Sequence, residues 1–149
     1  MDTVVGKGKT VLLVLTERKT REEIIRKIPS KSQRSVINAL NIIERKMGGK
    51  TFRKKFKTIT MDNGCEFLCQ EGIERSITTK RQRTKVYYCH PYRACVRGSN
   101  ENANKMIRRF IHKGADISKF SNKDIQRIEN YMNNSPRKIL GGLSARQAA

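Results

Sequence analysis

The chain has 149 residues, and its 33 Lys and Arg against 13 Asp and Glu give a formal net charge of +20. This length suits one domain, and a hydrophobic content of 36% is too high for a disordered chain. No apolar run approaches the ~20 residues that span a bilayer, and Met1 to Val5 does not resemble a signal peptide. Composition therefore argues against a secreted or membrane-spanning protein.

The excess of positive charge predicts a polyanionic partner. Nucleic acid fits best, because each phosphate contact releases counterions. An anionic membrane surface fits less well, since no segment resembles a basic amphipathic helix with aromatic anchors. A solvated, charge-rich surface is the simplest alternative, but a net charge of +20 is too one-sided for that interpretation.

The first part of the chain predicts three antiparallel strands joined by short turns. The first carries Asp2 and ends before a Gly-Lys-Gly turn, the second covers 10–16, and the third covers 22–28 before Pro29. Ser32 then caps a helix to about Met47, whose apolar residues recur on one face. Two glycines end that helix, and 50–57 is expected to be a basic linker.

The second part predicts two more strands and further helices. The strands cover 58–61 and 85–88, with a short helix over 66–75 and a polar loop over 77–83 between them. Helices follow over 99–112 and from Ser121, which forms a capping box with Asp124, to about Asn134. A helix that crosses between strands favours parallel neighbours. The order predicts an α/β, ribonuclease H-like fold with one mixed five-stranded sheet flanked by helices.

The four cysteines predict no disulfide framework. Free thiols are the default for a chain of this class. Cys65 and Cys69, with Cys89, His90 and Cys95, form the alternative of a zinc site, but their spacing matches no strong zinc pattern.

Three acidic residues are candidates for chemistry. Asp2 lies on the first strand, Asp62 ends the fourth, and Glu101 opens a late helix. On a helical wheel Glu101 shares its face with basic residues, and the opposite face is apolar. Each acid alone has an ordinary explanation as a terminal, turn or first-turn residue. Asp116 and Asp124 are assigned to a turn and a cap.

Carboxylates in this arrangement suit phosphodiester chemistry. Two Mg²⁺ ions ~3.5–4 Å apart can hold the attacking and leaving oxygens in line, and Mg²⁺ prefers carboxylate oxygens. We therefore expect two Mg²⁺ ions, with Mn²⁺ as a substitute. No Ser or Tyr is placed as a nucleophile, so no covalent protein–DNA intermediate is expected. Phosphate contacts are expected from Lys105, Arg108, Arg109, Arg53, Lys54, Lys55, Lys80 and Arg81.

Motifs along nearly the whole chain resemble the catalytic core of DDE transposases of the insertion-sequence-thirty type, which are related to retroviral integrases. The matching segments are 2–7, 15–21, 58–67 (Thr-Ile-Thr-Met-Asp-Asn-Gly-Cys-Glu-Phe), 90–92, 97–104 (Arg-Gly-Ser-Asn-Glu-Asn-Ala-Asn) and 133–138. The resemblance implies that Asp2, Asp62 and Glu101 form the metal-binding triad. It implies that Arg108 lies near the DNA backbone, and it leaves Asn63, Gly64 and Asn104 with shaping roles.

The resemblance also implies metal-dependent strand cleavage in transposition, followed by direct attack of the freed 3′-hydroxyl on a target phosphodiester. It implies DNA partners at element ends and target, a homo-multimer on paired ends, and a cytoplasmic, nucleoid-associated bacterial protein. Residues 1–149 are expected to form one integrase-like core without the N-terminal helix-turn-helix region and with a truncated first strand. Cys95 and Val96 stand where the family usually has Trp and Glu, and the departures favour a fragment or decayed copy. A non-catalytic basic nucleic-acid-binding protein and a nuclease or resolvase of the same fold stay open as alternatives.

Overall fold

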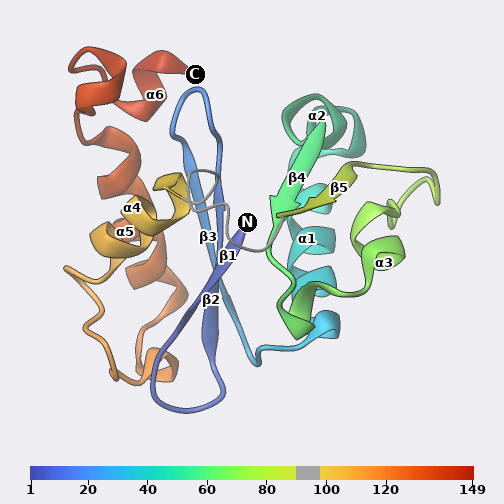
Figure 1. Ribbon diagram of the computed structural model, residues 1–149, viewed down its shortest axis with the longest axis horizontal. Helices are drawn as coiled ribbons and strands as arrows, with labels where there is room; N and C mark the ends of the chain where they lie inside the picture. The colour runs from blue at the N-terminus through green and yellow to red at the C-terminus, as the bar shows by residue number, and fades with distance from the viewer. Residues whose placement is uncertain (90–97) are drawn as a thin grey trace. The chain divides into compact units, whose positions relative to one another are not determined.

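The computed structural model describes residues 1–89 and 98–149, and the chain forms two compact units. One unit contains Met1–Lys27 and Ala94–Ala149, and the other contains Ile28–Arg93. The elements, shown in Figure 1, are β1 (Asp2–Val5), β2 (Val11–Thr16), β3 (Glu23–Ile28), α1 (Gln33–Met47), α2 (Gly49–Lys55), β4 (Thr58–Met61), η1 (Cys65–Phe67), α3 (Gln70–Glu74), β5 (Lys85–Tyr88), α4 (Gly98–Ile107), η3 (Ile117–Lys119), α5 (Asn122–Asn134), η4 (Lys138–Leu140) and α6 (Ala145–Ala148).

The three predicted N-terminal strands are confirmed as an antiparallel sheet in the order β1-β2-β3. In the ladder between β1 and β2, Asp2 lies opposite Val14 and Val5 lies opposite Val11. Five of the six residues of β2 are buried, as expected for a central strand whose residues are almost all apolar. This register places Asp2 at the first position of β1, opposite Val14 of β2.

Helices α4 and α5 pack against this sheet and complete the core of the first unit (Figure 1). The cluster joins apolar residues of all three strands to both helices: Val4, Leu12, Val14, Ile25, Ala103, Ile107, Ile111, Ile117, Ile125, Ile128 and Met132. The predicted start of α5 is confirmed, because Ser121 and Asp124 form the reciprocal capping box.

Helix α4 ends earlier than the expected boundary at residue 112. Its last helical residue is Ile107, and the N–H groups of Arg109 and Phe110 bond to carbonyls only three residues back. Such tightened bonds end an α-helix. Ile111 is nevertheless buried, so the apolar face continues in a turn. The wheel therefore placed most of this face correctly but overestimated the length of the helix.

In the second unit, α1 matches its prediction. Ser32 is the N-cap and accepts a hydrogen bond from the Ser35 N–H, while Gly48 follows Met47 with φ +82°. That left-handed backbone region favours glycine. The predicted face is buried at Val36, Leu40 and Ile43.

The stretch expected to be a basic linker is the helix α2, so that prediction was wrong. Phe52 is completely buried, and its ring lies 4.6 Å from that of Phe56. One buried aromatic anchor is enough to hold a short helix whose other residues are mostly basic and exposed. The basic residues around Phe52 gave no indication in the sequence that its side chain is buried.

The expected helix over 66–75 is divided into η1 and α3. Strands β4 and β5 confirm their predictions and pair in parallel, with Thr58 opposite Lys85 and Met61 opposite Tyr88. The parallel ladder places Asp62 at the carboxyl end of the pair.

The expected single five-stranded sheet is corrected to two sheets, one of three antiparallel strands and one of two parallel strands. The positions of the strands and their antiparallel or parallel pairing were predictable. The sequence did not show that the two groups of strands form separate sheets. Both β1 and β4 have four residues, so a ladder between them would add few bonds. The mixed α/β class holds, and the ribonuclease H-like assignment stays a prediction. In the described ranges, no helix combines the length and apolarity needed to cross a membrane.

Candidate functional site

The first part of the candidate site is the junction of β1 and α4. The Asn104 side-chain amide donates to Asp2 Oδ2 at 2.8 Å. One turn later, the Arg108 guanidinium donates to the Val5 carbonyl at 2.7 Å. These two bonds join α4 and the residue that follows it to the first and last residues of β1. Glu101 lies three residues before Asn104, so it belongs to the same face, and it is exposed.

The Asp2 carboxylate is half-buried and held at both oxygens. Its Oδ1 accepts the Thr3 N–H at 2.8 Å while Oδ2 accepts from Asn104. The carbonyl oxygen of Asn104 is buried, and it has no hydrogen-bond partner within the described residues. Buried polar atoms are almost always paired, so this acceptor is an exception next to the Asp2 carboxylate.

The start of α4 is tied to the turn between β2 and β3. The Arg21 guanidinium donates to the Ser99 hydroxyl, and Arg21 has a φ of +62°. A non-glycine residue in this region costs free energy. The contact with Ser99 fixes the helical turn that carries Glu101.

The second part of the candidate site follows β4. Asp62 Oδ1 accepts the Gly64 N–H at 3.0 Å. A Cβ on Gly64 would lie 2.7 Å from a Glu66 carboxylate oxygen and 3.0 Å from Asp62 Oδ1. Glycine at position 64 therefore allows both carboxylates to approach one short stretch of backbone. Glu66 is buried and pairs with Lys31 at 3.4 Å.

The predicted triad is divided between the two units. Asp2 and Glu101 lie in one, on elements that contact each other, and Asp62 lies in the other. Within neither unit, over 1–89 and 98–149, do three His, Cys, Asp or Glu side chains gather as a metal site would require. The triad and its Mg²⁺ ions stay predictions.

The two acids assigned to local structure are confirmed in those roles. Asp116 caps η3 by accepting from Ser118, and Asp124 accepts from Ser121. These bonds hold the pKa of each carboxyl below its ordinary value.

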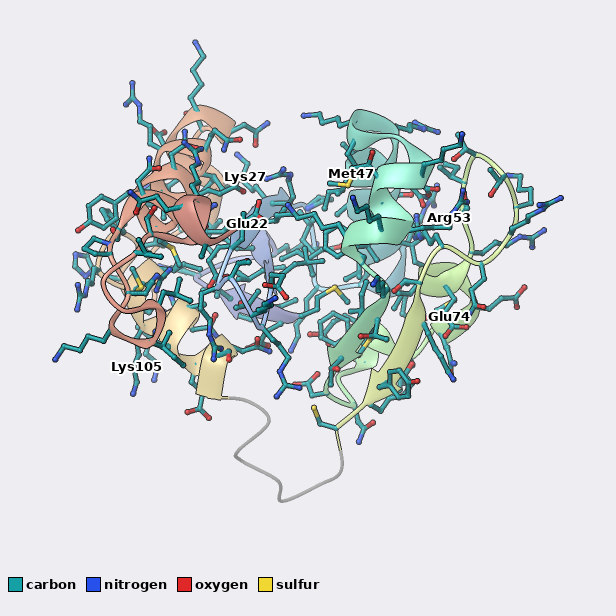
Figure 2. The ribbon with its side chains drawn as sticks, turned by 90° about the horizontal axis from the view of Figure 1, so that it is seen from above. Glu22, Lys27, Met47, Arg53, Glu74 and Lys105 are labelled. Carbon is teal, nitrogen blue, oxygen red and sulfur yellow. The ribbon has the colours of Figure 1, made fainter. Side chains whose placement is uncertain are left out.

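The basic residues expected to contact DNA fall into two groups. On the unit that contains α4, Lys105 (labelled in Figure 2) and Arg109 are exposed, whereas Arg108 is bound to Val5. The other unit carries 53–55 on α2 and 80–81 in the loop before β5, all exposed except the half-buried Arg53.

Two sequence-distant basic clusters converge on one open hollow in the second unit. Its volume is about 570 Å³, and it is lined by Arg53, Thr79, Arg81 and Gln82. Figure 2 shows Arg53 beside the loop that leads into β5. The sequence identified both basic clusters but did not show that they line the same hollow.

A buried ion pair holds that loop in place. Arg83 donates to Glu44 at 3.0 Å, and both side chains are 0% exposed. Ser76 and Thr78 also donate to the Glu44 carboxylate. Burial acts to raise the pKa of Glu44, but these hydrogen bonds and Arg83 outweigh it, so the pKa lies below its ordinary value. Glu44 is thereby held as a carboxylate.

Of the cysteines, Cys65 lies next to the turn after β4, where its thiol donates to a Glu66 carboxylate oxygen at 3.7 Å. Cys65, Cys69 and Cys89 are free thiols, as the default predicted. His90 and Cys95, the other members of the alternative zinc set, lie outside the described residues.

Two contributions to the site were not predicted as such. Glu66 was included only as part of a motif, although a buried carboxylate in an Asp-Asn-Gly-x-Glu sequence could have been suspected next to the turn. The sequence carried no signal for the pairing of Glu44 with Arg83, which are 39 positions apart. Asn104 was given a shaping role, which its bond to Asp2 fits.

Comparison with known proteins finds similar sequences among insertion-sequence transposases. The chain is 39% identical over 97% of its length to the transposase for insertion sequence element IS4351 of Bacteroides fragilis. It is 30% identical over 93% of its length to the transposase InsI for IS30C of Escherichia coli and 31% identical over 93% to the transposase for IS1086 of Cupriavidus metallidurans. The chain spans 41%, 34% and 39%, respectively, of the lengths of these relatives. No family model matches it.

Proposed function

We propose that this chain, which is similar over nearly its whole length to IS30-type transposases, supplies metal-dependent strand cleavage and strand transfer in transposition. The observation that supports the proposal best is the hydrogen bond between Asn104 and Asp2, because it joins the strand and the helix that carry two of the three proposed ligands. DNA at element ends and target is the proposed substrate, and a homo-multimer on paired ends is the proposed assembly.

The proposed metal ligands suit magnesium. Asp2, Asp62 and Glu101 offer only carboxylate oxygens, which are the donors that Mg²⁺ takes. The unpartnered Asn104 carbonyl adds a neutral oxygen beside Asp2. When bound, a pair of Mg²⁺ ions would stabilise the charge on the phosphodiester oxygens as Lewis acids.

The chain's own residues would prepare the site. Asn104 holds the Asp2 carboxylate in one orientation, so that less ordering is needed when substrate binds. The bond from Arg108 to Val5 is a second link between β1 and the chain at the end of α4, the helix that carries Glu101. The turn at Gly64 fixes the Asp62 carboxylate after β4. Lys105 and Arg109 offer exposed charges for phosphates near Glu101.

The proposal is tested by a strand-transfer assay of the protein with a labelled element end, target DNA, and Mg²⁺ or Mn²⁺. We expect Glu101→Gln and Asp62→Asn to abolish joined products while the variants still bind DNA. Asp116→Asn is the matched control, because it removes a carboxylate that only caps η3, and it should leave joining unchanged.

Each product pattern decides between the alternatives. Full joining by Glu101→Gln would refute the triad. Hydrolysed ends without joined strands would indicate a nuclease or resolvase. DNA binding that depends steeply on salt, without any product in either metal, would indicate a non-catalytic basic protein.

A further inference from the structure

The open hollow of the second unit is built from two segments that bring cations without acids. Between residues 50 and 57, and again between 77 and 85, the sequence contains Lys and Arg but no Asp or Glu. Arg53 comes from the first segment, and Arg81, Thr79 and Gln82 come from the second. The hollow is therefore an electropositive depression with neutral donors beside its two guanidinium groups.

The donors lining the hollow have few partners of their own. In the described part of the chain, neither Arg53 nor Arg81 forms an ion pair, and no hydrogen bond holds the Gln82 amide. The Thr79 hydroxyl accepts a long bond of 3.4 Å from the Arg81 N–H, which leaves its proton for another acceptor. An anion in the hollow could receive bonds from every one of these side chains.

The loop that carries Arg81 is held before any ligand arrives. Glu44 accepts from Ser76, from Thr78 and from the Ile77 N–H at 3.2 Å. Arg75 and Gln82, which flank residues 76–81, form an isolated antiparallel bridge across the base of the loop. A site that is preorganised in this way loses less conformational entropy on binding.

The hollow and Asp62 belong to opposite ends of the parallel strand pair. Residues 53 and 79–82 precede β4 and β5, whereas Asp62 follows β4 (Figure 1). Four residues of strand extend roughly 13 Å. A DNA strand advances about 3.4 Å per phosphate, so a phosphate in the hollow is several nucleotides away from one at Asp62.

We propose that Arg53 and Arg81 together grip one backbone phosphate of DNA, in the hollow completed by Thr79 and Gln82 and away from the reacting phosphodiester. Exposed lysines at 54, 55, 57 and 80 lie on both segments, so positive charge continues beyond the hollow, as a polymer requires and a small free anion does not. The choice of DNA rests on the proposed function. The contact positions the duplex without reading its sequence.

The test measures binding of a short duplex of arbitrary sequence in EDTA over a range of salt concentrations. Arg53→Ala and Arg81→Ala are each expected to weaken binding about tenfold. The double variant should weaken it little further and should lower the slope of log affinity against log salt by about one, the value for a single phosphate. Arg53→Lys should not restore affinity, because it keeps the charge but loses the two-pronged donor.

Lys54→Ala is the matched control, since it removes the same charge from the same helix but from a residue that does not line the hollow. Its effect should add to that of Arg81→Ala. The proposal is overturned if the two arginine substitutions add in the same way, or if the double variant lowers the slope by about two. Asp116→Asn, which removes a carboxylate that only caps η3, should bind like the wild type in EDTA. An absence of strand transfer with the arginine coupling intact would remove the proposed function and leave the hollow as a phosphate site.

Discussion

Replacing Arg83 by Met tests whether the buried network beneath the hollow supports the second unit. The guanidinium donates to four acceptors: Glu44 at 3.0 Å, Asn41 at 2.7 Å, the Ile73 carbonyl at 2.8 Å and the Gly72 carbonyl at 3.2 Å. It also lies over the ring of Phe52, 5.4 Å from its centroid, in a cation–π contact. Arg83→Met removes all of these and leaves the Glu44 carboxylate without its cation at a site that is 0% exposed.

The expected loss is large because the remaining charge stays buried. Removal of one partner from a buried ion pair typically costs about 3–5 kcal/mol of the free energy of unfolding. Ser76 and Thr78 still donate to Glu44, which favours the lower end of that range. Urea denaturation followed through the tyrosines should show a lower midpoint with an unchanged slope.

The second variant separates the charge from the packing. Glu44→Gln combined with Arg83→Met removes both charges, so it should be more stable than Arg83→Met alone by about 1–2 kcal/mol. A cost below about 1 kcal/mol for Arg83→Met would refute the reasoning. So would a double variant that is less stable than the single one.

Three further changes test separate features. Burial raises the pKa of Glu23 to about 7 from an ordinary 4.5, against the hydrogen bond from Thr16. Between those values the folded chain keeps a proton that the unfolded chain has lost, so the free energy of unfolding should fall by about 3 kcal/mol as pH rises from 4.5 to 7. Glu23→Gln should remove that decline in denaturation measured across this window. Ser121→Ala should cost about 1 kcal/mol in the same assay, because it removes half of the capping box. Gly64→Ala should lower the rate of strand transfer beyond what its loss of folding stability explains. The added Cβ would lie 2.7 Å from the Glu66 carboxylate and 3.0 Å from that of Asp62. An unchanged rate would contradict it.

Local structure was predictable wherever residues close together in the sequence determine it. The cap at Ser32, the capping box at Ser121 and the apolar face of α1 are each set by residues within a few positions. Helix α2 was missed because its cause is burial of Phe52 against other parts of the unit, which charge patterning does not reveal. The division into two sheets depends on which strand edges bond, and no local pattern specifies that.

The candidate site could be proposed from the sequence as a set of residues but not as a geometry. The resemblance implied Asp2, Asp62 and Glu101, which stay a prediction, and the periodicity of α4 placed Glu101 opposite its apolar residues. The convergence of Arg53 with Arg81 required the fold, because the buried pair of Glu44 and Arg83 determines the path of the loop.

Asn104 is the residue on which the proposed geometry depends most. Its amide fixes Asp2, while its own carbonyl is buried and unpaired in the described structure. Asn104→Leu has a similar volume, loses a charged hydrogen bond worth about 1.5–3 kcal/mol, and relieves the unpaired carbonyl. The two effects oppose each other, so the net loss of stability should stay below about 2 kcal/mol.

Strand transfer should respond to this substitution far more strongly, because an Asp2 carboxylate that rotates freely no longer meets the second ligand in one orientation. Comparison of joined products with denaturation midpoints at the same temperature separates the two contributions. Ser121→Ala is the control, because it lowers stability through the cap of α5 while leaving Asp2 held. If both variants lose joining only in proportion to their stability, Asn104 stabilises the helix against the strand and does not position the carboxylate.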